Sequence, residues 1–324
     1  MKRAGLLFSV FLGAFLVLGF LVGNTRPAEA GPLYQSERII RGAMLYDQWY
    51  VVLGVDPPAG DMPVWSRQSS NTRSGGDTWR CSTCHGWDYQ GKDGAYRSGS
   101  NFTGFPGVLD ASKTMSEEEI VQHLKGQNDP AHDFSVYMDE SALEDVAYFI
   151  KNGLIDDNLF IDPLTGKVTS GDQEHGKGLF LQQCAQCHGQ DGSQILFRYE
   201  GQNATLGTMA VIDPWRFLHK TRFGTPGTPM TIGYALGWTP QDGQDVLHFA
   251  QSLAPNVEPA TGEPVMNERS GGGNESPGGP ATSWFTGLLT ALGAMAASLG
   301  FALAFGGVFI GIVLILVWII RTRR

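Results

Sequence analysis

The sequence of 324 residues contains only four cysteines, too few for a scaffold held together by disulfides. All four belong to two short motifs of one form, Cys-x-x-Cys-His. The motif residues are Cys81, Cys84 and His85 in the first copy, and Cys184, Cys187 and His188 in the second. No thiol is left over for another disulfide, for a further metal site or for a cysteine nucleophile.

Basic residues are also scarce, with 23 Lys and Arg against 32 Asp and Glu and a formal net charge of −9. Several of the basic residues lie at the two ends of the chain, so the central part is more acidic still. Such a charge argues against nucleic acid as a partner. It favours a protein partner that carries a basic docking patch.

The adjacency of the second cysteine and the histidine is the specific feature of both motifs. A zinc ribbon would place its two Cys-x-x-Cys pairs about 15–20 residues apart, whereas Cys84 and Cys184 are much more widely separated. Covalent haem attachment uses every position of the motif, because two thiols add to the haem vinyl groups and the next residue ligates the iron. The sequence therefore predicts two covalently attached haem c groups, with His85 and His188 as iron ligands.

The N-terminus has the pattern of a secretory signal peptide. Lys2 and Arg3 precede an uncharged run over residues 4–24, and Ala-Glu-Ala at 28–30 is a small-x-small cleavage site. We expect residues 1–30 to be removed after Ala30, although an uncleaved anchor is the alternative. Export agrees with haem attachment, which takes place outside the cytoplasm.

The C-terminus has a second apolar segment, over residues 284–320, whose core at 299–320 has no charged residue and is long enough to span a bilayer. A basic tail, residues 321–324, follows directly and by the positive-inside bias stays in the cytoplasm. The expected topology is a single C-terminal span of the cytoplasmic membrane with the preceding chain on the periplasmic side. A hairpin of two shorter spans is the weaker alternative.

Between leader and anchor, two units repeat the order of opening helix, haem motif, irregular region and closing helix. Helices are expected at 37–53, 116–124 and 140–151 in the first unit, and at 173–183, 213–223 and 239–253 in the second. The expected divisions are a first domain 31–153 with an insertion at 55–78, a connector 154–171, a second domain 172–253 and a flexible linker 254–283.

With these elements in place, residues 36–253 resemble two class I cytochrome c domains in tandem, and the fold that the resemblance implies is all-α. In that family a methionine ahead of the last helix is the sixth iron ligand. Gly-Thr-Pro-Gly-Thr-Pro-Met at 224–230 is similar to the family's ligand loop, which implies Met230 for the second haem. Met138 holds the corresponding place in the first unit, and His132 competes with it.

Among the other methionines, Met115 and Met209 have no counterpart in the family. His123, His175, His219 and His248 are expected on helices as packing or surface residues, Met115 at the start of a helix and Met209 in a loop.

The resemblance implies a membrane-anchored dihaem c-type cytochrome that transfers single electrons between respiratory or other redox partners, which favours an electron carrier over an enzyme. A cytochrome subunit of a larger respiratory complex is the first alternative. A dihaem peroxidase would need an open iron site, and a dihaem sulfur-compound dehydrogenase often uses a distal cysteine, which this chain does not have to spare.

Overall fold

The computed structural model describes residues 32–199, 201–258 and 265. The expected signal peptide, most of the linker 254–283, the membrane segment 284–320 and the tail lie outside these residues. Within the described residues, no helix is both long enough and apolar enough to span a membrane.

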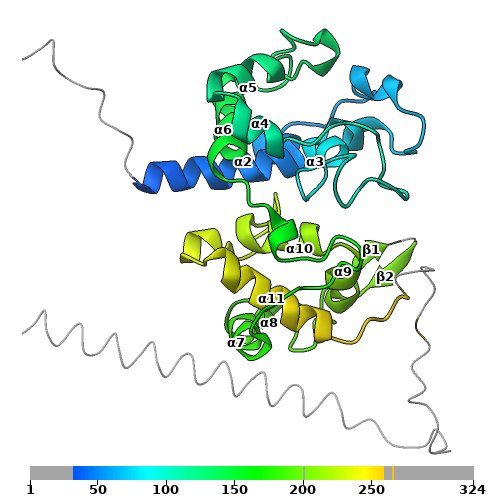
Figure 1. Cartoon of the computed structure of the whole chain (residues 1–324), viewed down its shortest axis with the longest axis vertical. Helices are drawn as coiled ribbons and strands as arrows, with labels where there is room; N and C mark the ends of the chain where they lie inside the picture. The colour runs from blue at the N-terminus through cyan, green and yellow to red at the C-terminus, as the bar shows by residue number, and fades with distance from the viewer. Residues whose placement is uncertain (1–31, 200, 259–264, 266–324) are drawn as a thin grey trace, which may run out of the picture. The chain divides into compact units, whose positions relative to one another are not determined.

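The described chain is mostly helical, as the sequence predicts (Figure 1). Its one small sheet is a hairpin of β1 (Phe197–Tyr199) and β2 (Gln202–Ala204), paired antiparallel. The sequence did not predict this hairpin, because three-residue strands give no periodic signal.

The first half is built around α2 (Pro32–Leu53), which packs along α6 (Glu140–Asn152). Gln48 interrupts the helical backbone of α2. Three shorter helices complete this half, namely α3 (Cys81–His85), α4 (Leu109–Thr114) and α5 (Glu117–Leu124). A capping box at Ser116 and Glu119 starts α5, and Asp139 caps α6, so both predicted helices begin where their cap residues indicate.

The expected insertion 55–78 is packed against the first half. It forms two single turns, η1 (Pro63–Arg67) and η2 (Gly75–Trp79). The indole of Trp49 donates to the carbonyl of Trp79 at 2.9 Å, and the indole of Trp79 donates to that of Gly60 at 2.9 Å. Two buried tryptophans therefore fix the insertion to α2.

The second half contains α7 (Gln173–Gln183), α8 (Ala185–His188), α9 (Leu206–Ile212), α10 (Pro214–Phe223) and α11 (Pro240–Ser252). Thr239 caps α11 and Pro240 is its first residue, as predicted. Met209 is a correction: it lies in α9 and not in a loop. Met115 is another, because it ends α4 instead of opening a helix.

The two halves repeat one helix crossing. In the first, Gly42 of α2 lies against Asp145 of α6, and the rings of Tyr46 and Phe149, one turn further along, have centroids 5.8 Å apart. In the second, Gly176 of α7 lies against Asp245 of α11, and the rings of Phe180 and Phe249 have centroids 5.2 Å apart. The spacing of four residues is the same in all four helices, which indicates an internal structural repeat.

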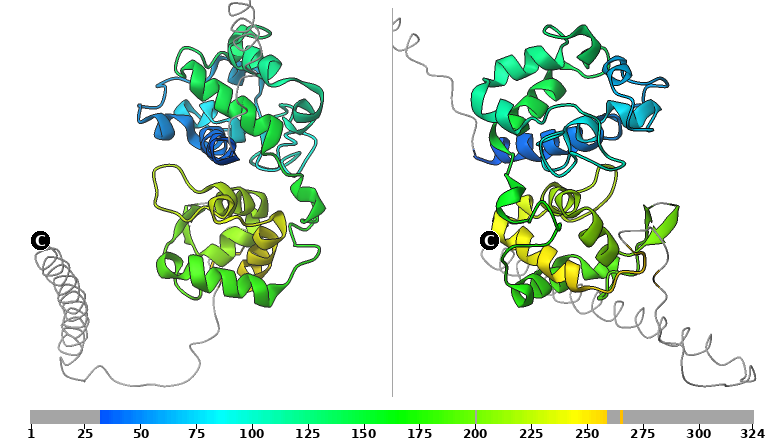
Figure 2. Two further views of the ribbon diagram at one scale, coloured as in Figure 1. Left: turned by 90° about the vertical axis from the view of Figure 1, so that its left-hand side faces the viewer. Right: turned by 45° about the vertical axis from the view of Figure 1, so that its right-hand side comes forward.

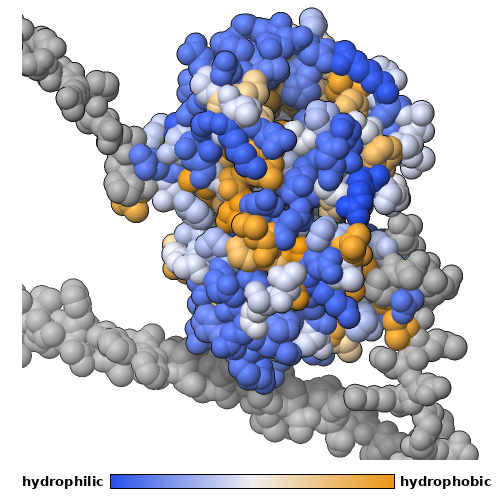
Figure 3. All heavy atoms as spheres, in the orientation of Figure 1, coloured by the Kyte–Doolittle hydropathy of each residue, from blue (hydrophilic) through white to orange (hydrophobic). Residues whose placement is uncertain are grey.

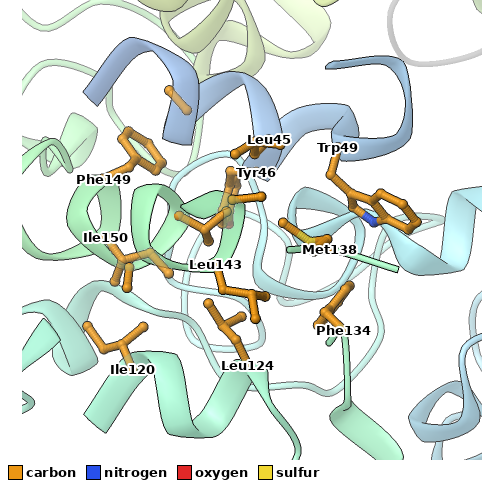
Figure 4. Packing of buried hydrophobic residues seen from close by; sticks show 14 of the residues in the cluster. Leu45, Tyr46, Trp49, Ile120, Leu124, Phe134, Met138, Leu143, Phe149 and Ile150 are labelled. Carbon is orange, nitrogen blue, oxygen red and sulfur yellow. The ribbon is translucent and has the colours of Figure 1, made fainter. Parts of the chain in front are cut away.

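Each half has its own hydrophobic core, and Figure 4 shows part of the first. Each core also contains a residue from the other half of the chain. Phe223 of α10 packs in the first core, and Trp87, just after the first motif, packs in the second. The connector 154–171 joins the halves and contains η4 (Asp157–Leu159) (Figure 2). Within η4, buried Asp157 accepts a hydrogen bond of 2.6 Å from Arg222.

The face drawn in Figure 3 is mostly hydrophilic, with apolar residues gathered near the middle of the view.

In the interior, the carboxylate of Asp47 is fully buried and forms ion pairs with Arg80, at 2.6 Å, and with Lys220. Although burial works to raise it, Lys220 and Arg80 hold the pKa of Asp47 below its ordinary value. The ion pairs link α2, the residue preceding the first motif and α10.

Candidate functional site

The first motif is a single helical turn. All of Cys81, Cys84 and His85 lie in α3, and the turn ends at Gly86 with φ 76°. A side chain at Gly86 would come within 2.6 Å of the Asp88 carboxylate and 2.7 Å of the Tyr96 ring. Glycine therefore allows the chain to turn sharply away once the motif is complete.

His85 is held in a fixed orientation by the backbone. Its Nδ1 is 2.6 Å from the carbonyl oxygen of Pro106, which leaves Nε2 as the free ring nitrogen. Burial, followed by the nearby His132, lowers the pKa of His85 to about 4. A neutral imidazole whose Nδ1–H is bonded to a carbonyl is the usual form of a metal ligand.

A cavity of about 440 Å³ lies beside the motif, and both Cys81 and His85 line it. Its other walls are mainly apolar and come from α4, α5, α6 and the loop before α4; they include Phe105, Val108, Ile120, Leu124, Val146 and Ile150. The volume falls in the range of pockets that hold organic ligands, about 300–1,000 Å³. The cavity is apolar and is lined by one motif thiol, Cys81, and by the imidazole of His85, a setting that would suit a covalently held porphyrin.

His132 faces this cavity as well. Its ring centroid is 6.1 Å from that of His85, and the two planes are inclined by 76°. It belongs to η3 (Pro130–His132), and its Nδ1 lies 3.3 Å from the carbonyl oxygen of His123. Burial lowers the pKa of His132, so this imidazole too is neutral at pH 7.

Met138 has a different environment. Its side chain is only 4% exposed and belongs to the first core, where Figure 4 shows it beside Leu143, Trp49 and Phe134. Met138 is not among the residues that line the cavity, whereas Met115 and His123 are. Of the two sixth-ligand candidates suggested by the sequence, the structure thus places His132, and not Met138, on the cavity wall.

The insertion covers one side of the same cavity through Val64 and Arg67. Arg67 forms a two-pronged ion pair with Asp129, with Nη2 2.8 Å from Oδ1 and Nη1 on Oδ2. Arg67 lowers the pKa of Asp129 to about 2. Asp129 also caps the turn that carries His132, accepting from Ala131 N at 3.1 Å.

The second motif follows α7 without an insertion, as predicted. Cys184 ends α7, α8 carries Cys187 and His188, and Gly189 ends the turn with φ 78°. Two adjoining hollows of about 160 and 200 Å³ lie beside it. Cys184, His188, Phe197 and Met230 line both hollows, so the predicted proximal and distal residues come together in the second half.

The polar contacts of the second site differ from those of the first. His188 Nδ1 is buried and has no hydrogen-bond partner among the described residues. The hydroxyl of Thr225 donates to the sulfur of Met230 at 3.4 Å. The ring of Phe197 on β1 is stacked on that of His188 with centroids 6.1 Å apart. Phe197 lies in no motif and has no sequence signal, whereas Thr225 lies in the 224–230 loop but its contact with the Met230 sulfur is not predictable from the sequence.

The thiols and the metal-ligand geometry also bear on the zinc alternative. All four cysteines are free, and burial raises the pKa of Cys81 and Cys84 to about 12 and that of Cys184 to about 11. Within the described ranges, no three His, Cys, Asp or Glu side chains come together as a metal site. Among the described residues, the two Cys-x-x-Cys pairs thus do not come together as a zinc ribbon would require.

The remaining histidines pack or bond to the protein. His219 is fully buried between Tyr89 and the carbonyl of Ala43, and His175 lies 2.9 Å from Asp245.

No family model matches the chain, and a search of curated proteins finds no match to it.

Proposed function

We propose that the chain is a membrane-anchored dihaem c-type cytochrome, built from two tandem class I cytochrome c-like domains, that carries single electrons between redox partners. The observation that carries this proposal is the duplication of one arrangement. In each half a Cys-x-x-Cys-His turn ends at a left-handed glycine and lines an apolar hollow. In each half the opening and closing helices also cross at a glycine.

The motif residues have defined roles in this proposal. Cys81 and Cys84 would hold the first haem, Cys184 and Cys187 the second, with His85 and His188 as proximal ligands. When bound, each haem supplies an iron that takes up and releases one electron. Pro106 fixes the ring of His85 by accepting from Nδ1, which keeps Nε2 available to the metal.

The walls of both hollows are apolar and limit the water around each site. Because little water has to reorient when the charge of the site changes, the reorganisation energy of electron transfer stays small. Met230 would occupy the sixth position in the second site. If His188 and Met230 both bind the iron, the second site would have no vacant place for peroxide or another substrate, which would favour a carrier over a dihaem peroxidase or sulfur-compound dehydrogenase.

The proposed location is the periplasmic face of the cytoplasmic membrane, with residues 299–320 as the anchor. A chain with net charge −9 suits redox partners that have basic docking surfaces. A subunit of a larger respiratory complex is the second candidate, and co-purification after mild detergent extraction distinguishes it from a free carrier.

The test is the ligand reactivity of the oxidised full-length protein, matured in a host with haem-attachment machinery. We expect low-spin absorption spectra and no rapid binding of cyanide or peroxide. A high-spin site that binds either ligand rapidly would replace the carrier by a catalyst. Recovery of the haem protein in the membrane fraction, and its release on truncation before residue 284, tests the anchor separately.

A further inference from the structure

Resting on the proposed function, we infer that His132, and not Met138, is the sixth ligand of the first haem, and that electrons run from this site to the second. The first site would then have two imidazole ligands, whereas the second has an imidazole and a thioether.

The hydrogen bonds of the histidines at the cavity distinguish His132 as the candidate sixth ligand. His85 and His132 each have Nδ1 near a backbone carbonyl, that of Pro106 at 2.6 Å and that of His123 at 3.3 Å. Both rings therefore have Nε2 left for a metal, the arrangement that orients metal-bound histidines in general. His123 also lines the cavity, but its Nε2 lies 3.0 Å from Nδ2 of Asn128 and is already engaged.

The separation of the two rings agrees with a shared metal. A metal–nitrogen bond to imidazole is about 2.0 Å long, so two imidazoles on opposite sides of one metal have ring centroids roughly 6 Å apart. The centroids of His85 and His132 are 6.1 Å apart. The two rings therefore do not need to move far for both to bind one iron.

The methionines around this site are less suited. Met138 packs in the core and does not line the cavity, so it would have to leave Trp49 and Phe134 to reach a metal there. Burial of a methionine side chain stabilises the folded protein, which opposes that movement. Met115 does line the cavity, and it is therefore included in the test below.

Arg67 is assigned as a positioning residue for His132. It contacts Asp129 with two hydrogen bonds, and Asp129 caps the η3 turn that ends in His132. The insertion that carries Arg67 has no equivalent in the second half, where the distal residue is a methionine. The insertion is therefore found only in the half whose inferred distal ligand is a histidine and not a methionine.

The direction of transfer follows from the ligands. Thioether ligation raises the potential of a haem relative to ligation by a second imidazole. The first site then has the lower potential and the second the higher. One electron from a one-electron donor protein would reduce the first site, pass to the second and leave to a one-electron acceptor protein of higher potential, with no proton required.

The test uses the full-length ferric protein with both haems attached. The near-infrared methionine-to-iron band should have the strength of one site, and a redox titration should show two separate waves. Met230→Ala should abolish the band. His132→Ala should convert one low-spin site to high-spin and shift only the lower-potential wave, whereas His123→Ala, Met115→Leu and Met138→Leu should leave both sites low-spin.

A methionine band with the strength of two sites, halved by Met138→Leu or by Met115→Leu, would overturn the inference while leaving the proposed function intact. Absence of covalent haem from the first motif would instead remove the proposed function. If His132→Ala does not fold, electron paramagnetic resonance of the unmutated protein decides, since bis-imidazole and imidazole–thioether ferric sites give different g-values.

Discussion

Gly42 of α2 lies so close to α6 that a Cβ at this position would be 2.0 Å from the carbonyl oxygen of Asp145. Gly176 has the same relationship to Asp245, at 1.8 Å. In both halves the opening and closing helices thus approach through a glycine. The contact with a backbone atom leaves no flexible side chain to move aside.

We expect Gly42→Ala to destabilise the protein by about 1–3 kcal/mol or more, because the added methyl group separates two packed helices. Gly178→Ala is the matched control, since nothing lies within 4 Å of a Cβ there. In the middle of α7 it should stabilise by about 0.5–1 kcal/mol through helix propensity. Urea unfolding measures both, and equal effects of the two variants would refute the packing argument.

Tyr89 and His219 connect the two halves by a buried hydrogen bond of 2.8 Å between the hydroxyl and Nδ1. Since Nε2 of His219 donates to the carbonyl of Ala43, Nδ1 must accept from Tyr89. Tyr89→Phe leaves that nitrogen unsatisfied and should cost about 1–3 kcal/mol. Tyr34→Phe, at an exposed position, should change the unfolding free energy little. An unchanged unfolding free energy in Tyr89→Phe would contradict the assignment of Tyr89 as the donor to Nδ1 of His219.

Acidification should weaken the fold through His219. Burial lowers its pKa to about 3, outweighing the opposing effect of Asp47, while Lys220 and Arg222 lower it further. Between this pKa and the ordinary value near 6.5, the unfolded chain binds the proton and the folded chain does not, so the stabilisation is complete above pH 6.5 and falls towards pH 3.

The measurement is urea unfolding between pH 7.5 and 4.5. His219→Gln should reduce the dependence on pH in this range, and His248→Gln, at a half-buried position on α11, should not. An unchanged pH profile in His219→Gln would show that another group is responsible for the acid sensitivity.

At the second site, the Thr225 hydroxyl bonded to the Met230 sulfur should influence the reduction potential. A hydrogen bond withdraws electron density from the thioether, which makes it a weaker donor to oxidised iron. We expect Thr225→Val to lower the potential of the second site, as measured by spectroelectrochemistry. Thr114→Val, at the end of α4, should leave it unchanged. A rise in potential would contradict this role of the hydroxyl.

Parts of this structure can be predicted from local sequence signals alone. Residues 173–183 and 240–252 are helical because an N-cap residue, Asp172 or Thr239, precedes a helix-forming stretch. The helices α4 and α9 were missed because each has only six or seven residues and depends on tertiary packing; Leu206 and Ala210 of α9 are buried in the second core.

The distal ligand of the first site illustrates a limit of sequence reasoning. Met138 and His132 lie six residues apart in one irregular segment, and spacing cannot decide which of them faces a cavity. The choice depends on contacts with distant residues, such as the pairing of Arg67 with Asp129 across 62 residues of sequence. No local pattern encodes such a contact.

The most direct test of the central claim is the mass of the intact protein after maturation in a host with haem-attachment machinery and extraction with acidic acetone. The account predicts that two haem masses stay bound to the chain. Replacing Cys81, Cys84 and His85, or instead Cys184, Cys187 and His188, by alanine should leave one. Protein that carries no covalent haem, or zinc in place of haem, would contradict the account.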